Sequence, residues 1–550
     1  MKKTIIRGGP GTGKTHMLME KIEDLLKDGI NFNNMAFVSF TKAAAYEGRE
    51  RVQKISGVKL KDIEYFRTIH SMCYRLLGLE KDMVIKSANK KEFCEKYGIP
   101  FAIERDINVD DYNLGSEIFD QKRIGNQIFA FYDRLRNVYL TNMSGISEQL
   151  FWKYWNETYM DSSSTKYLIS LNLYNFLLKW EAYKTGAGLY DFSDMLYNIY
   201  KQKLSPSVKY LIVDEFQDLT RLQYEIIRMW SKDMKRVIYA GDPDQSIYPF
   251  MGASPEYFWE EWKSATKNGK IKLKTSHRIR NNIRIFAQEF LKNNANPTLP
   301  PTYKSEKSDG VVKKTSIVSM SSLFFRIGEL LKKNRKIFFL ARTNYQKDEF
   351  TSILKKRGTP YINMGRGEQP WTKRTVSIHN ALQKIQSGET LSEDESITLF
   401  LNVASKNYLE HGLKTKIRSG DVSFSEKNDI EYLRGVGVEG LFFDLSYDQK
   451  IDALLPSSTS KTIKRVLKNA KNIGLVNNIN LYTGTIHSSK GKEAHIVIVL
   501  TDLTKNIYKS LKKQTDKENE ARVWYVAFTR ASDELVLVEY RRNNPMVGWI

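Results

Sequence analysis

The sequence predicts an α/β fold in which parallel strands alternate with helices around a loop suited to bind phosphate. The first indication is a glycine-rich segment, residues 8–15, which follows a short apolar run and precedes apolar residues at helical spacing. The second is a continuous apolar run, residues 208–213, which ends in Asp214 and Glu215. Because ligands of open α/β sheets bind beyond the carboxyl ends of the strands, we expect these carboxylates beside the glycine-rich loop.

The glycine-rich loop comprises Gly8, Gly9, Pro10, Gly11, Thr12, Gly13, Lys14 and Thr15. Its glycines permit a tight turn whose backbone N–H groups converge on a polyphosphate. Lys14 would reach the β- and γ-phosphates of a nucleotide such as ATP, and the Thr15 hydroxyl would hold Mg²⁺. A glycine-rich turn with a surface lysine is the alternative, and the order of strand, loop and helix argues against it.

The composition favours a globular protein of several domains with an anionic partner. The 550 residues are too many for one core, and 41% hydrophobic residues exclude a largely disordered chain. Only two cysteines, Cys73 and Cys94, and seven scattered histidines argue against a disulfide scaffold or a cysteine-rich zinc site. The net charge of +23 points to nucleic acid, although a lysine-rich chain with an evenly solvated surface would carry the same charge. No apolar run could span a bilayer and no signal segment precedes the first strand, so we expect a cytoplasmic protein without a membrane partner.

The alternation of strands and helices is interrupted once in the first half of the chain. Apolar runs at 35–40 and near residue 66 each lead into a helical pattern, whereas residues 81–185 carry long, aromatic-rich helical patterns that indicate an inserted helical domain. After the alternation returns, Asp214 can hold Mg²⁺ through water, and Glu215 can orient or deprotonate an attacking water. A charged pair that merely caps a strand is the alternative.

Four segments carry a family resemblance: GGPGTGKT at 8–15, FTKAAA at 40–45, DEFQDL at 214–219 and GDPDQSIYPFMGA at 241–253. They resemble the motifs of superfamily 1 DNA helicases of the UvrD/Rep type. Further matches follow in family order at 271–278, 338–346, 485–493 and 522–531. The matches therefore extend over both halves of the chain.

The resemblance implies two RecA-like P-loop NTPase domains, each a parallel sheet flanked by helices and each interrupted by a mainly helical insertion. The first RecA-like ATP-binding domain would comprise 1–80 and 186–266 with an insertion at 81–185, and the second would comprise 267–364 and 482–550 with an insertion at 365–481. No nuclease domain is expected after Arg530.

The resemblance also implies roles in ATP hydrolysis for residues far apart in the sequence. Gln245 would sense the γ-phosphate held by Lys14, Thr15, Asp214 and Glu215. Residues from the second domain would complete the site, namely Arg278 and Arg530 as arginine fingers and Glu493 at the ribose.

Single-stranded DNA needs a basic track and flat side chains on which bases stack. By resemblance, the DNA-facing residues are Phe40, Thr41, His70, Tyr248, Phe250, Arg342, Asn344 and His487. The three aromatic residues of this set would stack on bases, and the others would contact the backbone or the bases. Met251 stands where the family often has arginine, so one charged contact is missing.

Two histidines replace residues that the family places around the nucleotide base. His16 stands in place of an arginine and His277 in place of a tyrosine, and the upstream glutamine segment by which the family reads adenine has no room before the first strand. We hypothesise that His16 and His277 sandwich the adenine. Two partly exposed histidines without this role are the alternative.

The second insertion lacks recognisable family motifs but contains one basic, amphipathic stretch. Apolar residues between Ile463 and Ile473 would line one face of a helix, opposite Lys461, Lys464, Arg465, Lys468 and Lys471. A solvated basic face is one interpretation, and binding of duplex phosphates is the other.

The function predicted from these residues and the resemblance is that of an ATP-dependent DNA helicase and translocase, moving 3′ to 5′ on single-stranded DNA. Its partners would be single-stranded DNA, junctions with duplex, and repair or replication proteins. It would act as a monomer or weak oligomer in a bacterial cytoplasm, at the nucleoid or encoded by a phage. The first alternative is a DNA-stimulated ATPase that strips proteins from DNA as a subunit of a repair, replication or defence complex, and the second is a small-molecule kinase, which leaves 241–253 and 485–493 unexplained.

Overall fold

The computed structural model describes residues 2–40, 42–103, 124–158, 172–295, 303–365, 369–425, 427–455 and 459–540. The chain divides into two compact units, Met1–Val312 with Leu503–Asp533, and Lys313–Asp502 with Glu534–Ile550. Two six-stranded sheets flanked by helices confirm the predicted α/β class. No helix among the described residues combines the length and the apolar character needed to cross a membrane.

The first sheet carries the glycine-rich loop. Across the sheet its strands are β3 (Phe66–Thr68), β2 (Met35–Ser39), β4 (Tyr210–Val213), β5 (Arg236–Gly241), β1 (Lys2–Gly8) and β6 (Lys270–Leu273). All neighbouring strands are parallel, with Val38 beside Val213 and Ile6 beside Ala240. The strand after residue 266 therefore joins β1 at the edge of this sheet. Because the strands are parallel, the segments that follow β1, β4 and β5 leave the same edge.

Helices cover both faces of the first sheet because successive strand residues point to opposite sides. Ile6 packs with Leu18 and Ile22, whereas the adjacent Ile5 packs with Met72 and Ile226 on the other face. The helices around this sheet are α1 (Lys14–Lys27), α2 (Lys42–Ser56), α3 (Ile69–Leu76), α9 (Phe192–Gln202), α10 (Arg221–Ser231) and α11 (Glu256–Ser264). The same unit includes β7 (Thr275–Ser276), β8 (Lys304–Ser305), α12 (Asn281–Ala295), α22 (Lys505–Ser510) and α23 (Gln514–Phe528).

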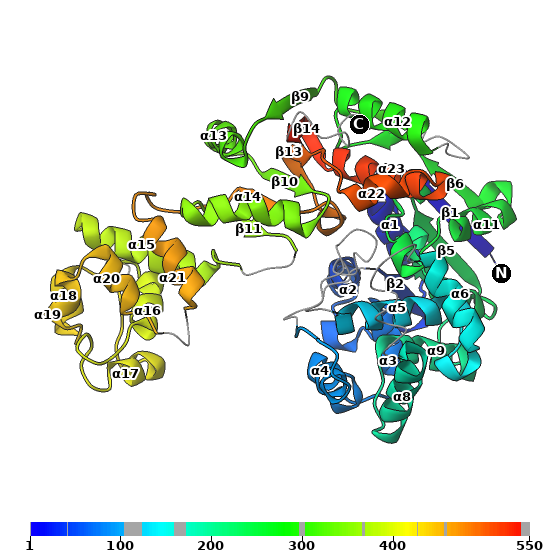
Figure 1. Cartoon of the computed structure of the whole chain (residues 1–550), viewed down its shortest axis with the longest axis horizontal. Helices are drawn as coiled ribbons and strands as arrows, with labels where there is room; N and C mark the ends of the chain where they lie inside the picture. Colours follow the sequence, from blue (N-terminus) through cyan, green and yellow to red (C-terminus); the bar gives the residue numbers. More distant parts are fainter. Residues whose placement is uncertain are drawn as a thin grey trace. The chain divides into compact units, whose positions relative to one another are not determined.

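The first insertion is helical, as predicted, and has an aromatic core. Its described helices are α4 (Ser87–Lys96), α5 (Ile124–Tyr139), α6 (Glu148–Thr158) and α8 (Leu173–Gly186). Trp180 packs there against both Phe93 and Phe129, with ring centroids 5.0 Å and 4.8 Å apart. In Figure 1 these helices run in colour from blue (α4) through cyan (α5 and α6) to blue-green (α8).

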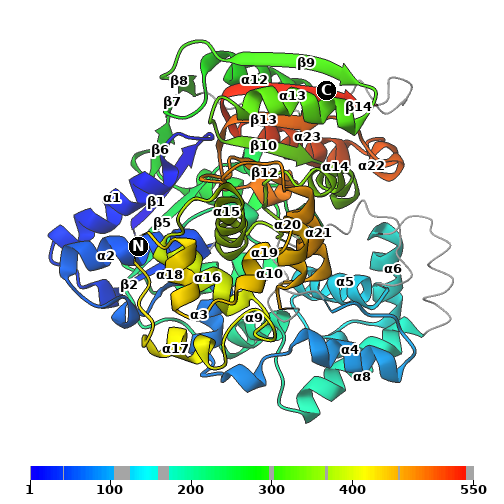
Figure 2. The ribbon, with the colours of Figure 1, turned by 90° about the vertical axis from the view of Figure 1, so that its left-hand side faces the viewer.

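The second sheet follows the order β11 (Ile362–Asn363), β12 (Leu481–Thr485), β10 (Ile337–Ala341), β13 (Ala494–Leu500), β14 (Ala531–Tyr540) and β9 (Val311–Ile317). Figure 2 shows β9, β13, β10 and β12 of this sheet near α13 (Met320–Leu331) and α14 (Asn344–Lys356). Every residue of β10 is buried, as expected of a central strand covered on both faces.

The second insertion is also helical. It contains α15 (Lys373–Ser387), α16 (Glu393–Asn402), α17 (Leu413–Ser419), α18 (Ile430–Gly435), α19 (Gly440–Asp444), α20 (Tyr447–Asp452) and α21 (Lys461–Asn469), which form one group in Figure 1. The buried His379 fastens this group: one ring nitrogen lies 2.8 Å from the Tyr447 hydroxyl and the other 3.0 Å from the Ile473 carbonyl.

Candidate functional site

The glycine-rich loop connects the end of β1 to the start of α1, as the sequence predicts. Gly11 and Gly13 have φ angles of +71° and +83°, in the left-handed region that favours glycine. The Lys14 ammonium donates to the carbonyl oxygens of Gly8 (2.9 Å) and Gly9 (3.3 Å), so the loop curls around this cation. With the N-terminus of α1 at the same place, the loop presents a lysine and helix N–H groups to an anion.

Asp214 leaves β4 directly beside the start of α1. The Thr15 hydroxyl donates to Asp214 Oδ2 at 3.1 Å, and the backbone N–H of Asp214 donates to Val38 on β2 at 2.9 Å. Burial, together with the charge of Glu215, raises the pKa of Asp214 to about 7. This carboxylate is therefore a poorly solvated anion whose charged form would be stabilised by a cation.

The same residues fit a magnesium ion. A buried carboxylate and a hydroxyl are oxygen donors of the kind that Mg²⁺ accepts alongside phosphate oxygens and water. Within the described residues no group of three or more His, Cys, Asp or Glu side chains could hold a metal ion. This donor set is therefore suited to a metal that arrives with a nucleotide.

Glu215 follows with a φ of +52°, an unusual conformation for a residue other than glycine. Such a backbone costs about 1 kcal/mol or more and persists only where neighbouring contacts impose it. Its backbone N–H donates to Asp214 Oδ1 at 2.9 Å, and its carboxylate accepts a hydrogen bond from the Gln217 amide. The two adjacent carboxylates thus have separate partners.

Gln245 and Arg530 meet within the first unit although 285 positions separate them. Gln245 lies on the short helix η8 (Pro243–Gln245) after β5, and Arg530 follows α23. Arg530 Nη2 donates to Gln245 Oε1 at 3.0 Å, and Gln245 Nε2 donates to Asp242 Oδ2 at 2.5 Å. Arg530 is only 2% exposed, so its guanidinium is buried beside Gln245 and has little access to solvent.

Arg278 lies against the glycine-rich loop. A Cβ placed on Gly11 would come within 2.6 Å of the Arg278 Cβ and 2.8 Å of the Ser276 hydroxyl. That hydroxyl donates to the Pro10 carbonyl at 2.9 Å, and the His277 backbone N–H donates to the Gly11 carbonyl at 3.0 Å. Segment 276–278 is thus fastened to the loop through its backbone and Ser276.

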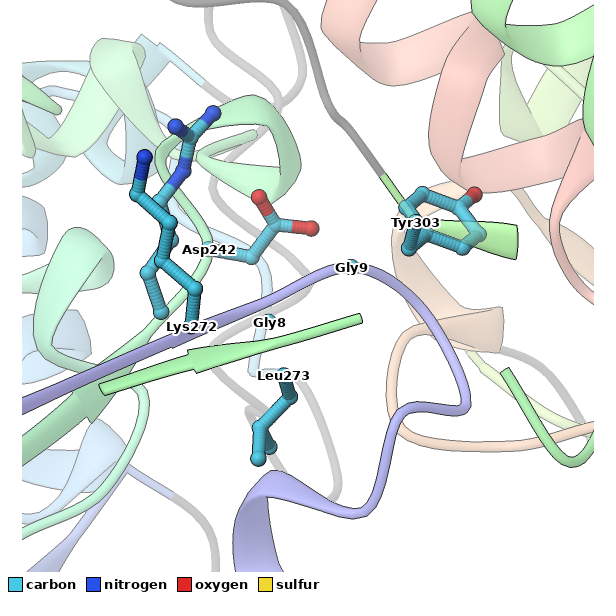
Figure 3. A pocket seen from close by; sticks show the side chains of 7 residues that line it. Gly8, Gly9, Asp242, Lys272, Leu273 and Tyr303 are labelled. Atoms are coloured by element: carbon cyan, nitrogen blue, oxygen red, sulfur yellow. The ribbon is translucent and has the colours of Figure 1, made fainter. Parts of the chain in front are cut away.

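A small pocket adjoins the start of the loop (Figure 3). It has a volume of about 20 Å³, room for about one water molecule, and is lined by Arg7, Gly8, Gly9, Asp242, Lys272, Leu273 and Tyr303. Tyr303 lies beside Gly9, where a Cβ would come within 2.3 Å of the tyrosine ring, and its hydroxyl is 3.0 Å from that of Tyr525. The closeness of the Tyr303 ring accounts for glycine at position 9.

The two histidines proposed to sandwich adenine both lie at the surface. His16 Nε2 is 3.3 Å from Glu20, and its side chain is 64% exposed. His277 Nδ1 is 2.6 Å from Glu306, and its side chain is 60% exposed. Each imidazole therefore has an acidic neighbour, and the adenine sandwich stays a hypothesis. Glu493, the residue expected at the ribose, directly precedes β13 in the second unit.

Aromatic rings contact one another after β2 and β5, and a further ring contact lies at α3. Phe40 stacks on Tyr248 with ring centroids 5.1 Å apart, and Phe250 meets Tyr248 edge-on at 6.0 Å. The His70 ring meets Phe192 edge-on at 5.3 Å. Tyr248 is only 3% exposed, so in this structure its ring is covered by Phe40 and neighbouring groups. Thr41 lies outside the described residues.

The DNA-facing residues expected in the second unit lie at one edge of its sheet. Arg342 follows β10, and His487 begins the short helix η11 (His487–Ser489) after β12. These strands are parallel neighbours, and the Ile486 N–H donates to the Ala341 carbonyl at 3.0 Å. Arg342 and His487 are buried, whereas Asn344 is half-buried in the first turn of α14.

Two exposed aromatic residues were missed by the sequence analysis. Phe192 is 59% exposed and contacts His70, while Tyr345 is 74% exposed and directly follows Asn344. Both are adjacent to polar motif residues, but sequence alone does not distinguish an exposed aromatic ring from a buried one.

Comparisons with known proteins agree with this geometry. Residues 1–266 match the UvrD/REP helicase N-terminal domain, and residues 446–542 match the UvrD-like helicase C-terminal domain. Together these matches cover more than half of the chain. The chain belongs to the UvrD/Rep-like DNA helicases. It is therefore an ATP-hydrolysing enzyme, and both the family resemblance and the expected fold of two RecA-like domains are confirmed.

Individual UvrD/Rep-like relatives align along nearly the whole chain. The probable DNA helicase II homolog of Mycoplasma capricolum is 25% identical over 98% of this chain and 82% of its own length. The ATP-dependent DNA helicase PcrA of Staphylococcus aureus is 23% identical over 99% of this chain and 82% of its own length. PcrA of Bacillus subtilis is 24% identical, with 97% and 80% covered.

Proposed function

We propose that this UvrD/Rep-like helicase moves 3′ to 5′ along single-stranded DNA and separates duplex at the junctions that it meets. The proposal rests on the segment after β5, which carries both a residue expected at the ATP site and a residue expected to face DNA. Gln245 contacts Arg530 beside the ATP-site motifs, and three residues later Tyr248 stacks on Phe40. In the proposed mechanism, a change in the contact of Gln245 with Arg530 alters the contact of Tyr248 with Phe40, and the reverse.

ATP binding begins with exchange of partners at Lys14. In the proposed complex the ammonium exchanges the carbonyls of Gly8 and Gly9 for phosphate oxygens, with which it forms stronger, charge-assisted bonds. Thr15 and Asp214 would hold Mg²⁺, which supplies charge neutralisation to the β- and γ-phosphates. The raised pKa of Asp214 supports this assignment, because a cation offsets the cost of burying the carboxylate.

Hydrolysis needs a positioned water and cations around the transferred phosphoryl group. We assign Glu215 to hold the water and accept its proton, and Gln245 to contact the γ-phosphate. Arg278 and Arg530 would neutralise the charge that spreads over the phosphoryl oxygens, an effect worth 10³-fold or more in related enzymes, on the order of several kcal/mol. Glu493 would bind the ribose.

We infer from the motifs that 1–80 and 186–266 form the first RecA-like domain and that 267–364 and 482–550 form the second. In this division β6, at the start of the second domain, pairs with β1 of the first sheet, and 267–312 and 503–533 pack in the first compact unit. Opening and closing of these domains would move the strand, which would contact the DNA-facing residues of both units, namely Phe40, His70, Tyr248, Phe250, Arg342, Asn344 and His487. The protein would act in the cytoplasm, as a monomer or weak oligomer, together with repair or replication proteins.

The direction is tested with labelled duplexes that carry a single-stranded tail at either the 3′ or the 5′ end. The proposal predicts ATP-dependent separation of the 3′-tailed duplex and little separation of the 5′-tailed one, with no activity in Lys14→Ala. Preference for the 5′ tail would contradict the direction. DNA-stimulated hydrolysis without separation of either duplex would instead favour the alternative of an ATPase that strips proteins from DNA.

A further inference from the structure

Gln217 is a buried side chain between the proposed catalytic carboxylate and the segment after β5. It lies on the short helix η7 (Phe216–Asp218) and is 0% exposed. Its amide nitrogen donates to Glu215 Oε2, and its amide oxygen accepts the Asp242 backbone N–H at 2.9 Å. Its own carbonyl accepts the Ser246 hydroxyl at 3.0 Å. Gln217 thus binds Glu215 through its amide nitrogen, Asp242 through its amide oxygen and Ser246 through its backbone carbonyl.

The segment that Gln217 holds is the one that carries the other proposed contacts. The Asp242 carboxylate accepts from Gln245, whose oxygen accepts from Arg530. Ser246 is two residues from Tyr248, which stacks on Phe40. Hydrogen bonds therefore link Glu215 through Gln217 and Asp242 to Gln245, the residue expected at the γ-phosphate. From Ser246, which donates to the Gln217 carbonyl, the backbone continues over two residues to Tyr248 of the aromatic pair.

The surrounding structure leaves little freedom at this junction. A Cβ on Gly241 would come within 2.6 Å of Gln217 Oε1, so a glycine is required for the amide to approach the strand end. Glu215 itself has a φ of +52° that local contacts must maintain. Displacement of Asp242 or Ser246 would therefore change the hydrogen bond that holds the Glu215 carboxylate.

The Gln217 amide donates to the carboxylate that we assign to the attacking water. We propose that Gln217 is a positioning residue that couples the state of the segment after β5 to the orientation of Glu215, so that binding of single-stranded DNA changes the rate of ATP hydrolysis. This inference rests on the proposed function.

The test measures ATP hydrolysis by the full chain with and without oligo(dT), for wild type, Gln217→Met and Ser246→Ala. The expected result is that the stimulation by DNA falls about fivefold or more in Gln217→Met, within the range typical of coupling between sites, while the KM for ATP and the Kd for oligo(dT) stay within about twofold. Ser246→Ala breaks the link from the other side without removing a buried amide, and it should also lower the stimulation. A role in packing alone would not change this ratio selectively.

Gln223→Met is the matched control, because Gln223 is also a buried glutamine but caps α10 by accepting the Thr220 N–H at 3.0 Å. Unchanged stimulation in folded Gln217→Met and in Ser246→Ala would overturn the inference, as would an equal loss in Gln223→Met. Wild-type hydrolysis that ignores DNA would overturn the proposed function, and this inference with it. Normal stimulation of wild type with unchanged variants overturns the inference alone.

Discussion

Phe40 and Tyr248 illustrate how much of a proposed DNA contact depends on single side chains. Their rings are stacked, and Tyr248 is nearly inaccessible beneath Phe40 and its neighbours. A base that stacks here therefore meets Phe40 first, or separates the pair. For this reason, loss of the Phe40 ring should weaken binding of single-stranded DNA more directly than loss of Tyr248.

Replacement of Phe40 by alanine should weaken binding of single-stranded DNA by about 5- to 150-fold, because one base–aromatic stack is worth about 1–3 kcal/mol. The measurement is fluorescence anisotropy of a labelled oligo(dT) at a fixed salt concentration, since salt alone changes such affinities strongly. Tyr432→Ala is the control, because this tyrosine is also exposed but belongs to the second insertion. Equal affinities of Phe40→Ala and wild type would contradict the assigned stack.

Asp244 is a buried carboxylate next to the same segment. Burial, followed by the charge of Asp242, raises the pKa of Asp244 to about 7, although Arg7 at 3.4 Å opposes the shift. Folded protein therefore keeps a proton that the unfolded chain, with a pKa near 3.8, has already lost. Between about pH 4 and pH 7 the contribution of Asp244 to stability must decline as the pH rises.

Asp244→Asn removes this titration. We expect the melting temperature of the variant, relative to that of wild type, to be higher at pH 8 than at pH 5, because only wild type loses the proton-linked stabilisation. Thermal unfolding of both proteins in matched buffers measures the difference. A difference between the two proteins that is independent of pH would show that Asp244 ionises normally.

At the scale of elements, a buried ionic cluster joins the first insertion to α9. Lys184 on α8 contacts Asp191 and, at 2.5 Å, Asp194, while Arg136 on α5 donates to Asp194 at 2.7 Å. Lys184 and Arg136 hold the pKa of Asp191 below its usual range, although burial alone would raise it. The ends of three helices are therefore held together by charges that have little access to water.

Lys184→Met should destabilise this part of the protein by about 3–5 kcal/mol, because it leaves buried carboxylates without one of their cations. Urea unfolding followed by tryptophan fluorescence would report the loss, since Trp180 lies on the same helix. Lys179→Met, an exposed position on α8, should change stability by no more than about 0.5 kcal/mol. Coincident unfolding curves for Lys184→Met and wild type would contradict the role assigned to the cluster.

Elements that depend on local sequence could be predicted, and the family resemblance brought distant motif residues such as Gln245 and Arg530 together in advance. Contacts that neither a local pattern nor the resemblance indicates could not be predicted. The loop around Lys14 and the strand that ends at Asp214 follow from glycine positions and apolar runs that are visible in short windows. The Gln217 and Lys184 contacts required knowledge of which segments meet after folding. The basic face of α21 was predicted, but its contacts were not. Lys464 donates to the carbonyls at the end of α20 and Lys468 pairs with Asp452, so part of that face stabilises the fold.

The whole molecule combines an ATP-site unit with a strongly basic overall charge. The net charge of +23 would attract any nucleic acid, and charge by itself does not couple binding to hydrolysis. Coupling requires that the residues around Lys14 and Gln245 respond when DNA occupies the aromatic residues. The central claim is therefore that hydrolysis depends on DNA.

The most direct measurement is steady-state ATP hydrolysis by the full chain with and without single-stranded DNA, repeated with RNA and with the Lys14→Ala and Arg530→Ala variants. We expect strong stimulation by DNA and loss of activity in both variants, because one lacks the phosphate-binding ammonium and the other lacks the arginine that contacts Gln245. Robust hydrolysis by wild type that is the same with and without nucleic acid would contradict this expectation.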